Sequence, residues 1–151
     1  MEKRRISTSA EETEILAESI GREAFSGALI ALWGEMGAGK TAFVHGLCRG
    51  MGLPDNVSSP TFALIHEHDG PIPLYHFDLY RLSSEEELFS VGVEEYWYGT
   101  GLSVIEWPEL AGSRLPKERL DIRFRIIDDN CRELCFQTDS LLYKKMLEAL
   151  L

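Results

Sequence analysis

The stretch GEMGAGKT, residues 34–41, decides the fold that we expect for this chain. It fits the phosphate-binding pattern G-x-x-x-x-G-K-[ST] at every position. The apolar run ALIALW (28–33) before it is typical of a central strand covered on both faces. The residues after it predict a helix that ends near Gly50 and Gly52. The apolar stripe of this helix comprises Phe43, Val44, Leu47, Cys48 and Met51. A strand, a glycine loop and a helix in this order predict a site for nucleotide phosphates.

The glycine loop has a chemistry that follows from its backbone. Glycines permit conformations in which successive N–H groups turn inward on the β-phosphate, aided by the positive end of the next helix. Lys40 would reach the β- and γ-phosphates, and the Thr41 hydroxyl would ligate Mg²⁺. The residues expected to surround the nucleotide here are Glu35, Met36, Gly37, Ala38, Gly39, Lys40, Thr41 and Ala42. The alternative is a flexible glycine-rich turn with a solvated lysine.

A phosphate site of this kind needs carboxylates for the metal and the attacking water. Asp78 ends the apolar stretch LYHF (74–77), and Glu106 ends LSVI (102–105). Open α/β sheets bind ligands at the carboxyl ends of their strands, so we favour a functional role for both over ordinary strand-end acids.

A third candidate is Thr61, in the segment Ser-Pro-Thr-Phe (59–62) at the entry to a strand. Its hydroxyl could sense the γ-phosphate or its Mg²⁺, as switch loops do. Ser-Pro as a simple turn starter is the open alternative. The sequence lacks the Asn/Thr-Lys-x-Asp element that reads guanine, which favours ATP over GTP.

The histidines and cysteines show no metal-ligand grouping. His66 and His68 lie on one face of a predicted strand, and we expect them to be solvated. The other two histidines are His45 and His76. The cysteines, for which we expect reduced packing roles, are Cys48, Cys131 and Cys135.

The remaining pattern predicts helices on both sides of many strands. A capping box from Ser9 to Glu12 opens a first helix that ends by Gly27. Its apolar residues are Ile15, Leu16, Ile20 and Ala24. Later elements are strands at 61–68 and 73–80 forming a hairpin around Asp69-Gly70, a broken helix at 83–97, a strand at 101–107, strands at 119–128 and 132–138 forming an edge hairpin, and a helix at 141–151.

We therefore expect residues 1–151 to form a single P-loop NTPase domain of the α/β class. It would be a three-layer α/β/α structure with a mixed, partly parallel sheet and a C-terminal antiparallel hairpin. This length suffices for one substantial core.

Composition limits the partners. The formal net charge of −10 opposes gripping a nucleic acid over a large surface, which needs clustered Lys and Arg. The charged opening MEKRRISTSAEE (1–12) has no apolar stretch behind it, so we expect no signal peptide. No segment approaches the ~18 uninterrupted apolar residues of a membrane span. We expect a cytoplasmic protein without a membrane partner.

Six stretches together resemble the TsaE family, the P-loop ATPases of bacterial tRNA threonylcarbamoyladenosine biosynthesis. They are GEMGAGKTAFVHGL, VSSPTFALIHEH, YHFDLYRL, EEELFSVGVEEY, SVIEWPE and RLDIRF. They occur in the family's order and spacing and cover nearly the whole chain. The P-loop alone would name only a superfamily, whereas SPTF, HFDLYRL and IEWPE are far more specific.

The resemblance implies roles for individual residues. Thr41 and Glu106 would hold Mg²⁺, and Asp78 would be the Walker-B-like acid near the nucleotide. Thr61 would belong to the switch loop, and Trp107 would lie beside the metal carboxylate. The residues expected to act in hydrolysis are thus Lys40, Thr61, Asp78 and Glu106.

Three further nucleotide contacts also come from the resemblance. The family contacts nucleotide from the start of its first helix, here Ser9 and Ala10. A Gly-Arg-Glu turn late in the chain does the same, and matches Arg132, although Cys131 stands in place of the glycine. The loop reads GEM where many members have Gly-Asp-Leu.

The resemblance also implies how the protein works. It would bind ATP and Mg²⁺ and act on the TsaD–TsaB pair, in which TsaD transfers the threonylcarbamoyl group, with tRNA met only through that complex. No arginine-finger position is evident in the sequence, which predicts slow hydrolysis alone and faster hydrolysis with a partner. Two alternatives stay open: a nucleotide-dependent interaction module whose hydrolysis is not required, and a small-molecule P-loop kinase.

Overall fold

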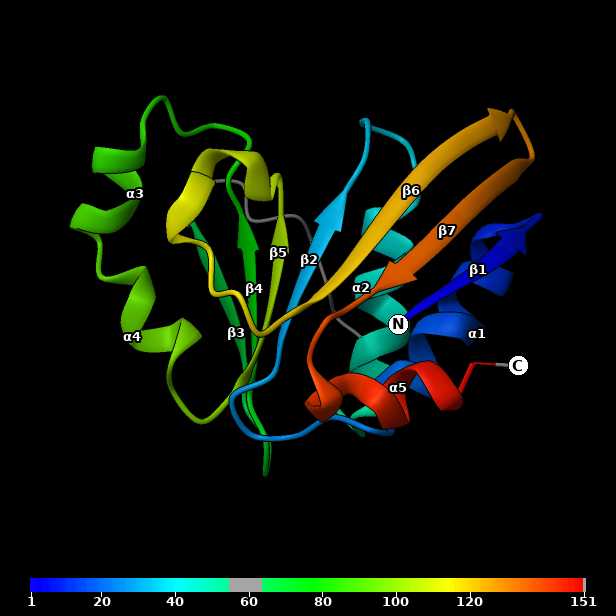
Figure 1. Ribbon diagram of the computed structural model, residues 1–151, viewed down its shortest axis with the longest axis horizontal. Helices are drawn as coiled ribbons and strands as arrows, with labels where there is room; N and C mark the ends of the chain where they lie inside the picture. Colours follow the sequence, from blue (N-terminus) through cyan, green and yellow to red (C-terminus); the bar gives the residue numbers. More distant parts are fainter. Residues whose placement is uncertain (55–63, 151) are drawn as a thin grey trace.

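The computed structural model describes residues 1–54 and 64–150. Within these ranges the chain forms a seven-stranded sheet in the order β1-β7-β6-β2-β5-β4-β3 (Figure 1). Strands β6, β2, β5 and β4 run parallel to one another, while β1, β7 and β3 are antiparallel to their neighbours. The strands are β1 (Glu2–Ser7), β2 (Leu29–Trp33), β3 (Ile65–His68), β4 (Leu74–Asp78), β5 (Leu102–Glu106), β6 (Leu120–Asp128) and β7 (Cys131–Gln137).

Helices cover the sheet on both faces (Figure 1). One face carries α1 (Ala10–Gly21), α2 (Lys40–Gly50), the 3₁₀ turn η2 (Leu141–Tyr143) and α5 (Lys144–Glu148). The other carries α3 (Glu85–Ser90), α4 (Val93–Trp97) and the 3₁₀ segment η1 (Pro108–Arg114). The three-layer α/β/α arrangement with a mixed sheet, predicted from the sequence, is confirmed. Both predicted hairpins, β3–β4 and β6–β7, are present.

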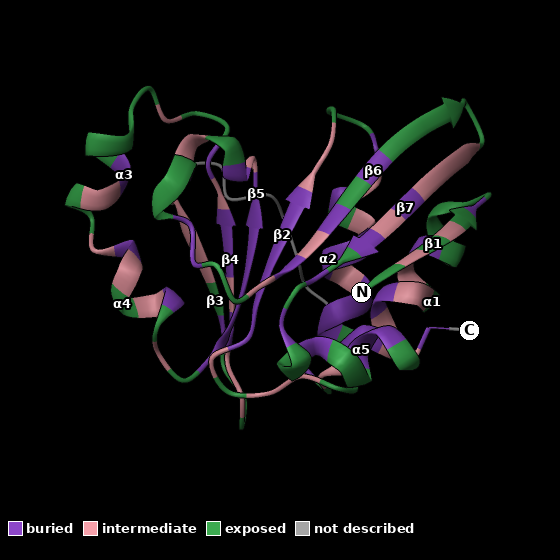
Figure 2. Ribbon diagram, in the orientation of Figure 1, coloured by how far each residue is buried: buried purple, intermediate pink, exposed green. Residues whose placement is uncertain are grey.

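Two apolar cores follow from the alternation of side chains along the strands. In β2, Ile30 and Leu32 face the α1–α2 layer, whereas Leu29 and Ala31 face the α3–α4 layer. All four are buried, which is why ALIALW is a continuous apolar run and why the centre of the sheet is purple in Figure 2. The helix α2 contributes Phe43, Val44, Leu47 and Cys48 to the first core, as the stripe predicts.

Helices α1 and α2 pack so closely that glycine is required between them. A Cβ on Gly46 would lie 2.2 Å from the carbonyl oxygen of Glu14 and 2.7 Å from Cβ of Ala17. The backbone of α2 therefore touches that of α1 directly at this point. This contact fixes the helix that begins at the glycine loop against its neighbour.

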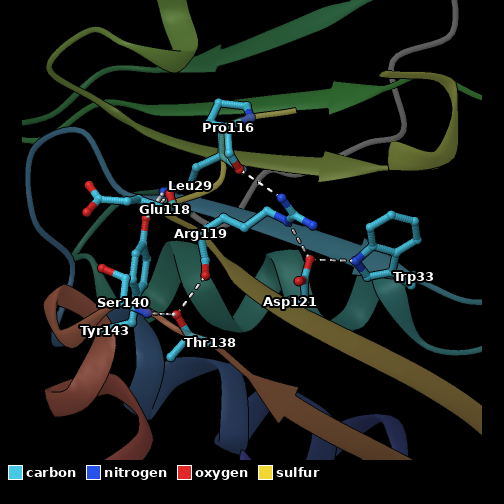
Figure 3. A network of polar contacts seen from close by, with 9 residues as sticks. All are labelled: Leu29, Trp33, Pro116, Glu118, Arg119, Asp121, Thr138, Ser140 and Tyr143. Carbon is cyan, nitrogen blue, oxygen red and sulfur yellow. Dashed lines mark hydrogen bonds and ion pairs between the residues drawn. The ribbon is translucent and has the colours of Figure 1, made fainter. Parts of the chain in front are cut away.

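A polar network fastens the C-terminal segment to the start of β2 (Figure 3). The Tyr143 hydroxyl accepts a hydrogen bond from the backbone N–H of Leu29 at 2.9 Å and donates to the Glu118 carbonyl at 3.3 Å. The Thr138 hydroxyl donates to the Arg119 carbonyl at 2.8 Å. These bonds connect the start of β2 to the residues just before β6 and to the segment that follows β7.

The same network extends to the other end of β2 through Asp121 (Figure 3). Oδ1 of Asp121 accepts from Nε of Arg119 and from Nε1 of Trp33, each at 2.8 Å. Arg119 also donates to the Pro116 carbonyl at 2.9 Å. Trp33 immediately precedes the glycine loop, so the network holds both ends of the strand that carries it.

Three expectations about elements are wrong in detail. The β6–β7 hairpin is not at the edge of the sheet, because β1 pairs with β7 and β2 pairs with β6. The first helix ends at Gly21, within the expected limit of Gly27, but Ala24 lies beyond it and Ile15 is 57% exposed, so neither belongs to a buried stripe of this helix as expected. Strand β1 was not predicted: its sequence EKRRIS is mostly charged, and its apolar Ile6 lies on the exposed face.

None of the helices within residues 1–54 and 64–150 has the length and apolar character needed to cross a bilayer.

Candidate functional site

The glycine loop connects β2 to α2 through backbone conformations that favour glycine. Gly34 has φ of 147°, and a Cβ there would lie 2.9 Å from the Phe124 carbonyl oxygen on β6. Gly39, with φ of 104°, is the N-cap of α2. Both are left-handed conformations that other residues adopt only with strain. The loop therefore turns tightly over the end of the sheet and presents the N-terminus of an eleven-residue helix.

Lys40 begins α2 and extends back across the loop. Its Nζ donates to the Gly34 carbonyl at 2.7 Å and lies 3.7 Å from the centre of the Trp107 ring. Burial lowers the pKa of the Lys40 ammonium from its ordinary value, an effect that the negative charges of Glu106, Glu109 and Asp78 partly oppose. The ammonium thus lies among carboxylates, above an aromatic face.

The two predicted carboxylates lie next to each other. Asp78 ends β4 and Glu106 ends β5, and they are paired in register across these parallel strands. Glu106 is buried and its Oε2 forms a 2.6 Å hydrogen bond with Nε2 of His76. Asp78 is partly exposed, and its Oδ1 accepts from the backbone N–H of Tyr80 at 3.1 Å.

These groups line one cleft of about 380 Å³ at the carboxyl ends of the parallel strands. Its walls are Met36, Gly37, Gly39, Lys40, Thr41, Asp78, Tyr80, Glu106 and Trp107. A hydroxyl and two carboxylates are oxygen ligands of the kind that Mg²⁺ takes alongside phosphate oxygens. The donor set therefore fits Mg²⁺ bound together with a nucleotide. The predicted grouping of Lys40, Thr41, Asp78, Glu106 and Trp107 is present.

Trp107 is the one non-glycine residue with positive φ among the described residues. Its φ of 60° places it in the left-handed region directly after Glu106, and its ring packs against Tyr80 with centroids 5.0 Å apart. A bulky residue holds this conformation at a cost of about 1 kcal/mol or more. In this conformation the indole lies against the Lys40 ammonium.

A second cleft, of about 220 Å³, lies on the other side of Gly37 and Gly39. Its remaining walls are Ser7, Thr8, Ser9, Ala10, Thr13, Asp129, Asn130 and Arg132. Nη2 of Arg132 donates to the Gly37 carbonyl at 3.2 Å, which connects β7 to the glycine loop. The structure thus brings Ser9, Ala10 and Arg132 together, although they come from opposite ends of the sequence.

Other predicted residues lie elsewhere. The side chain of Ala38 is buried in the core, Glu35 is exposed, and neither they nor Ala42 line either of these two clefts. Thr61 lies outside the described residues. Another cavity, of about 620 Å³, lies around Leu29 at the opposite end of β2, and none of the predicted site residues lines it.

Sequence reasoning missed two residues of the first cleft region. Tyr80 lines the cleft, and His76 contacts Glu106. The signal for His76 was its position two residues before Asp78, which places it on the same face of β4. His68 was expected to be solvated, and that is wrong. It is 6% exposed, and burial lowers the pKa of its imidazole, with smaller effects from His66 and His76.

Comparison with known proteins identifies the family of this chain. The family model described as threonylcarbamoyl adenosine biosynthesis protein TsaE matches residues 7–134. The chain belongs to the TsaE family. Its matched range begins at Ser7, in the wall of the second cleft, and extends beyond Arg132. Both clefts are therefore within the part that the TsaE family shares.

Curated relatives carry the name tRNA threonylcarbamoyladenosine biosynthesis protein TsaE. That of Treponema pallidum is 42% identical over 129 residues, covering 85% of this chain and 96% of the relative. That of Bacillus subtilis is 40% identical over 141 residues, covering 93% and 88%. The crystal structure of Bacillus subtilis YdiB matches with a TM-score of 0.81 and 33% identity, covering 98% of this chain and 93% of that one. Membership of the TsaE family supports a role in threonylcarbamoyl adenosine biosynthesis.

Proposed function

We propose that this protein is a Mg²⁺-dependent ATPase, slow on its own, that supports N6-threonylcarbamoylation of tRNA adenosine by acting on the TsaD–TsaB pair. The observation that carries the proposal is the first cleft. It combines the lysine and threonine of a glycine loop with two carboxylates that end adjacent parallel strands. The family's name supports the pathway, and the cleft supports the chemistry.

The glycine loop and the side chains expected to act in the first cleft have distinct roles in this proposal. The loop N–H groups and the start of α2 bind the phosphates, and Lys40 leaves the Gly34 carbonyl to pair with them. Thr41 and Glu106 would hold Mg²⁺, which would supply positive charge to the phosphate oxygens. Asp78 would orient the attacking water. The base and sugar occupy the second cleft, where Ser9, Ala10 and Arg132 lie.

A partner is part of the proposal because Lys40 is the one cation among the described residues that line the first cleft. Among the described residues that line it, no arginine is present. The Arg132 guanidinium lies in the second cleft and donates to the carbonyls of Gly37, Asp128 and Cys131. A group supplied by the TsaD–TsaB pair would complete the site and accelerate hydrolysis. The net charge of −10 agrees with action through a protein.

The test is ATP turnover by the purified protein with Mg²⁺, with and without its cognate TsaD–TsaB pair. We expect slow turnover alone and a rise when the pair is added. Glu106→Gln should lower turnover by roughly 100-fold or more, because it removes the charge of a proposed Mg²⁺ ligand. Glu109→Gln is the matched control: Glu109 is exposed and acts on Lys40 only at a distance.

Three outcomes separate the proposal from its alternatives. Equal turnover with and without the pair would refute stimulation by the partner. If Glu106→Gln still supported tRNA modification without hydrolysis, the protein would be a nucleotide-dependent interaction module. Transfer of phosphate to an added metabolite would instead make it a kinase.

A further inference from the structure

The hydrogen bond between His76 and Glu106 is the interaction that the proposed function does not yet use. His76 lies in β4 and is 0% exposed, and its Nε2 is 2.6 Å from Oε2 of Glu106, which is 5% exposed. A carboxylate that binds a metal is ionised and can only accept, so in that state Nε2 donates to it. The bond then holds one carboxylate oxygen in place.

Stability alone does not explain a histidine at this position. Nδ1 of His76 is buried and has no hydrogen-bond partner within the described part of the chain. An unpaired buried nitrogen costs about 1–3 kcal/mol, which an apolar residue in its place would avoid. Leu74, two residues earlier on the same face of β4, shows that the core accepts an apolar side chain here. Buried polar pairs generally add little net stability.

The partners of Glu106 are few. Its Oε1 has no hydrogen bond within residues 1–54 and 64–150, and no salt bridge joins it to Lys40, although both line the first cleft. Lys40 is held separately, by the Gly34 carbonyl and the Trp107 ring. Within the described residues, His76 is thus the one hydrogen-bond partner of the Glu106 carboxylate, and Oε1 has none.

We propose that His76 is a positioning residue that holds the Glu106 carboxylate in place for Mg²⁺. The inference rests on the proposed function, since it needs Glu106 to be a metal ligand. Residues that hydrogen-bond metal ligands typically change metal affinity or activity by about 10–100-fold when they are replaced. In this role His76 does not contact the metal. It acts by setting the orientation of the Glu106 carboxylate more than by its own charge.

Two variants that carry a side-chain amide differ in length, so together they test whether a donor must extend to the position of Nε2. His76→Gln places an N–H donor near the position of Nε2, whereas the shorter His76→Asn does not. The measurement is the Mg²⁺ dependence of affinity for a non-hydrolysable ATP analogue, by calorimetry, beside affinity in excess EDTA. We expect His76→Asn to require at least about tenfold more Mg²⁺ than wild type, with affinity in EDTA unchanged. His76→Gln should retain most of the wild-type Mg²⁺ dependence.

The matched control is His68→Asn. His68 is also a buried histidine, on the neighbouring strand β3, but it has no hydrogen bond to either cleft carboxylate. It should leave the Mg²⁺ dependence at the wild-type value. Thermal unfolding checks that each variant is folded, and His76→Leu, which suits the apolar core, replaces His76→Asn if that variant does not fold.

The outcomes distinguish this inference from the proposed function. If wild type binds the analogue and responds to Mg²⁺, but His76→Asn and His76→Gln both respond as wild type does, the positioning role is refuted. Equal loss in His76→Gln and His76→Asn also refutes it, since reach would then not matter. If wild type binds no analogue at all, the proposed function and this inference fall together.

Discussion

Replacing Tyr143 by Phe removes one hydroxyl and keeps the aromatic ring. The ring packs against Phe25 with centroids 5.1 Å apart, and Tyr143 is 1% exposed, so the substitution leaves the apolar packing intact. What it removes is the acceptor for the backbone N–H of Leu29. Leu29 is itself 1% exposed, so the substitution leaves a buried N–H without its protein acceptor.

The expected loss follows from these two bonds. A buried donor left without a partner costs about 1–3 kcal/mol, and the 3.3 Å bond to the Glu118 carbonyl adds little because it is long and Glu118 is exposed. We expect the free energy of unfolding to fall by about 2 kcal/mol. For a chain of this size that lowers Tm by roughly 4–8 °C.

Urea unfolding measures this loss directly. The midpoint should fall while the m-value stays constant, because the same surface is exposed on unfolding. Tyr98→Phe is the control, since that side chain is 67% exposed and should change stability by less than ~0.5 kcal/mol. If the two variants differed by less than that amount, the hydrogen bond to Leu29 would not hold the start of β2, and the reasoning would be wrong.

Three other perturbations probe the packing, the titration and the second cleft. Gly46→Ala should destabilise the fold by about 1–3 kcal/mol in a denaturant titration, because the added Cβ would lie 2.2 Å from the Glu14 carbonyl oxygen. Since burial lowers the folded-state pKa of His68 below 6.5, the unfolded chain protonates first as pH falls. The contribution of His68 to the free energy of unfolding is therefore complete above pH 6.5 and is lost below it. His68→Leu should make the free energy of unfolding depend less on pH between 7.5 and 5 than it does in wild type. Arg132→Ala should weaken ATP binding about tenfold in calorimetry, whereas Arg125→Ala, on an exposed side chain of β6, should not; equal affinities would remove Arg132 from the nucleotide site.

The sequence predicted the central strands and the first cleft because each has a local cause. ALIALW is apolar throughout since both faces of β2 are covered, and Asp78 and Glu106 end apolar runs because parallel strands finish at one edge of the sheet. These patterns depend on neighbours in sequence. They are therefore visible before any tertiary contact is known.

The errors come from positions whose role is set by distant parts of the chain. Strand β1 has no apolar alternation because it is paired along one edge and exposed on one face, so only β7 identifies it as a strand. His68 is buried by packing of the sheet, which spacing along one strand cannot show. The grouping of Ser9, Ala10 and Arg132 came from the family resemblance, because no local pattern connects residues so far apart.

Because β1 pairs with β7, the first strand to be synthesised cannot pair until β7 has been made. Ser7 lies opposite Arg132, so the two walls of the second cleft are among the first and last parts of the sheet to leave the ribosome. At roughly 5–20 residues per second, the first strand waits about 6–25 s for its partner. Its residues Glu2, Lys3, Arg4 and Arg5 are charged, which discourages an unpaired strand from joining other chains. The nascent protein has its glycine loop early, but the second cleft is complete only after Arg132 has been synthesised.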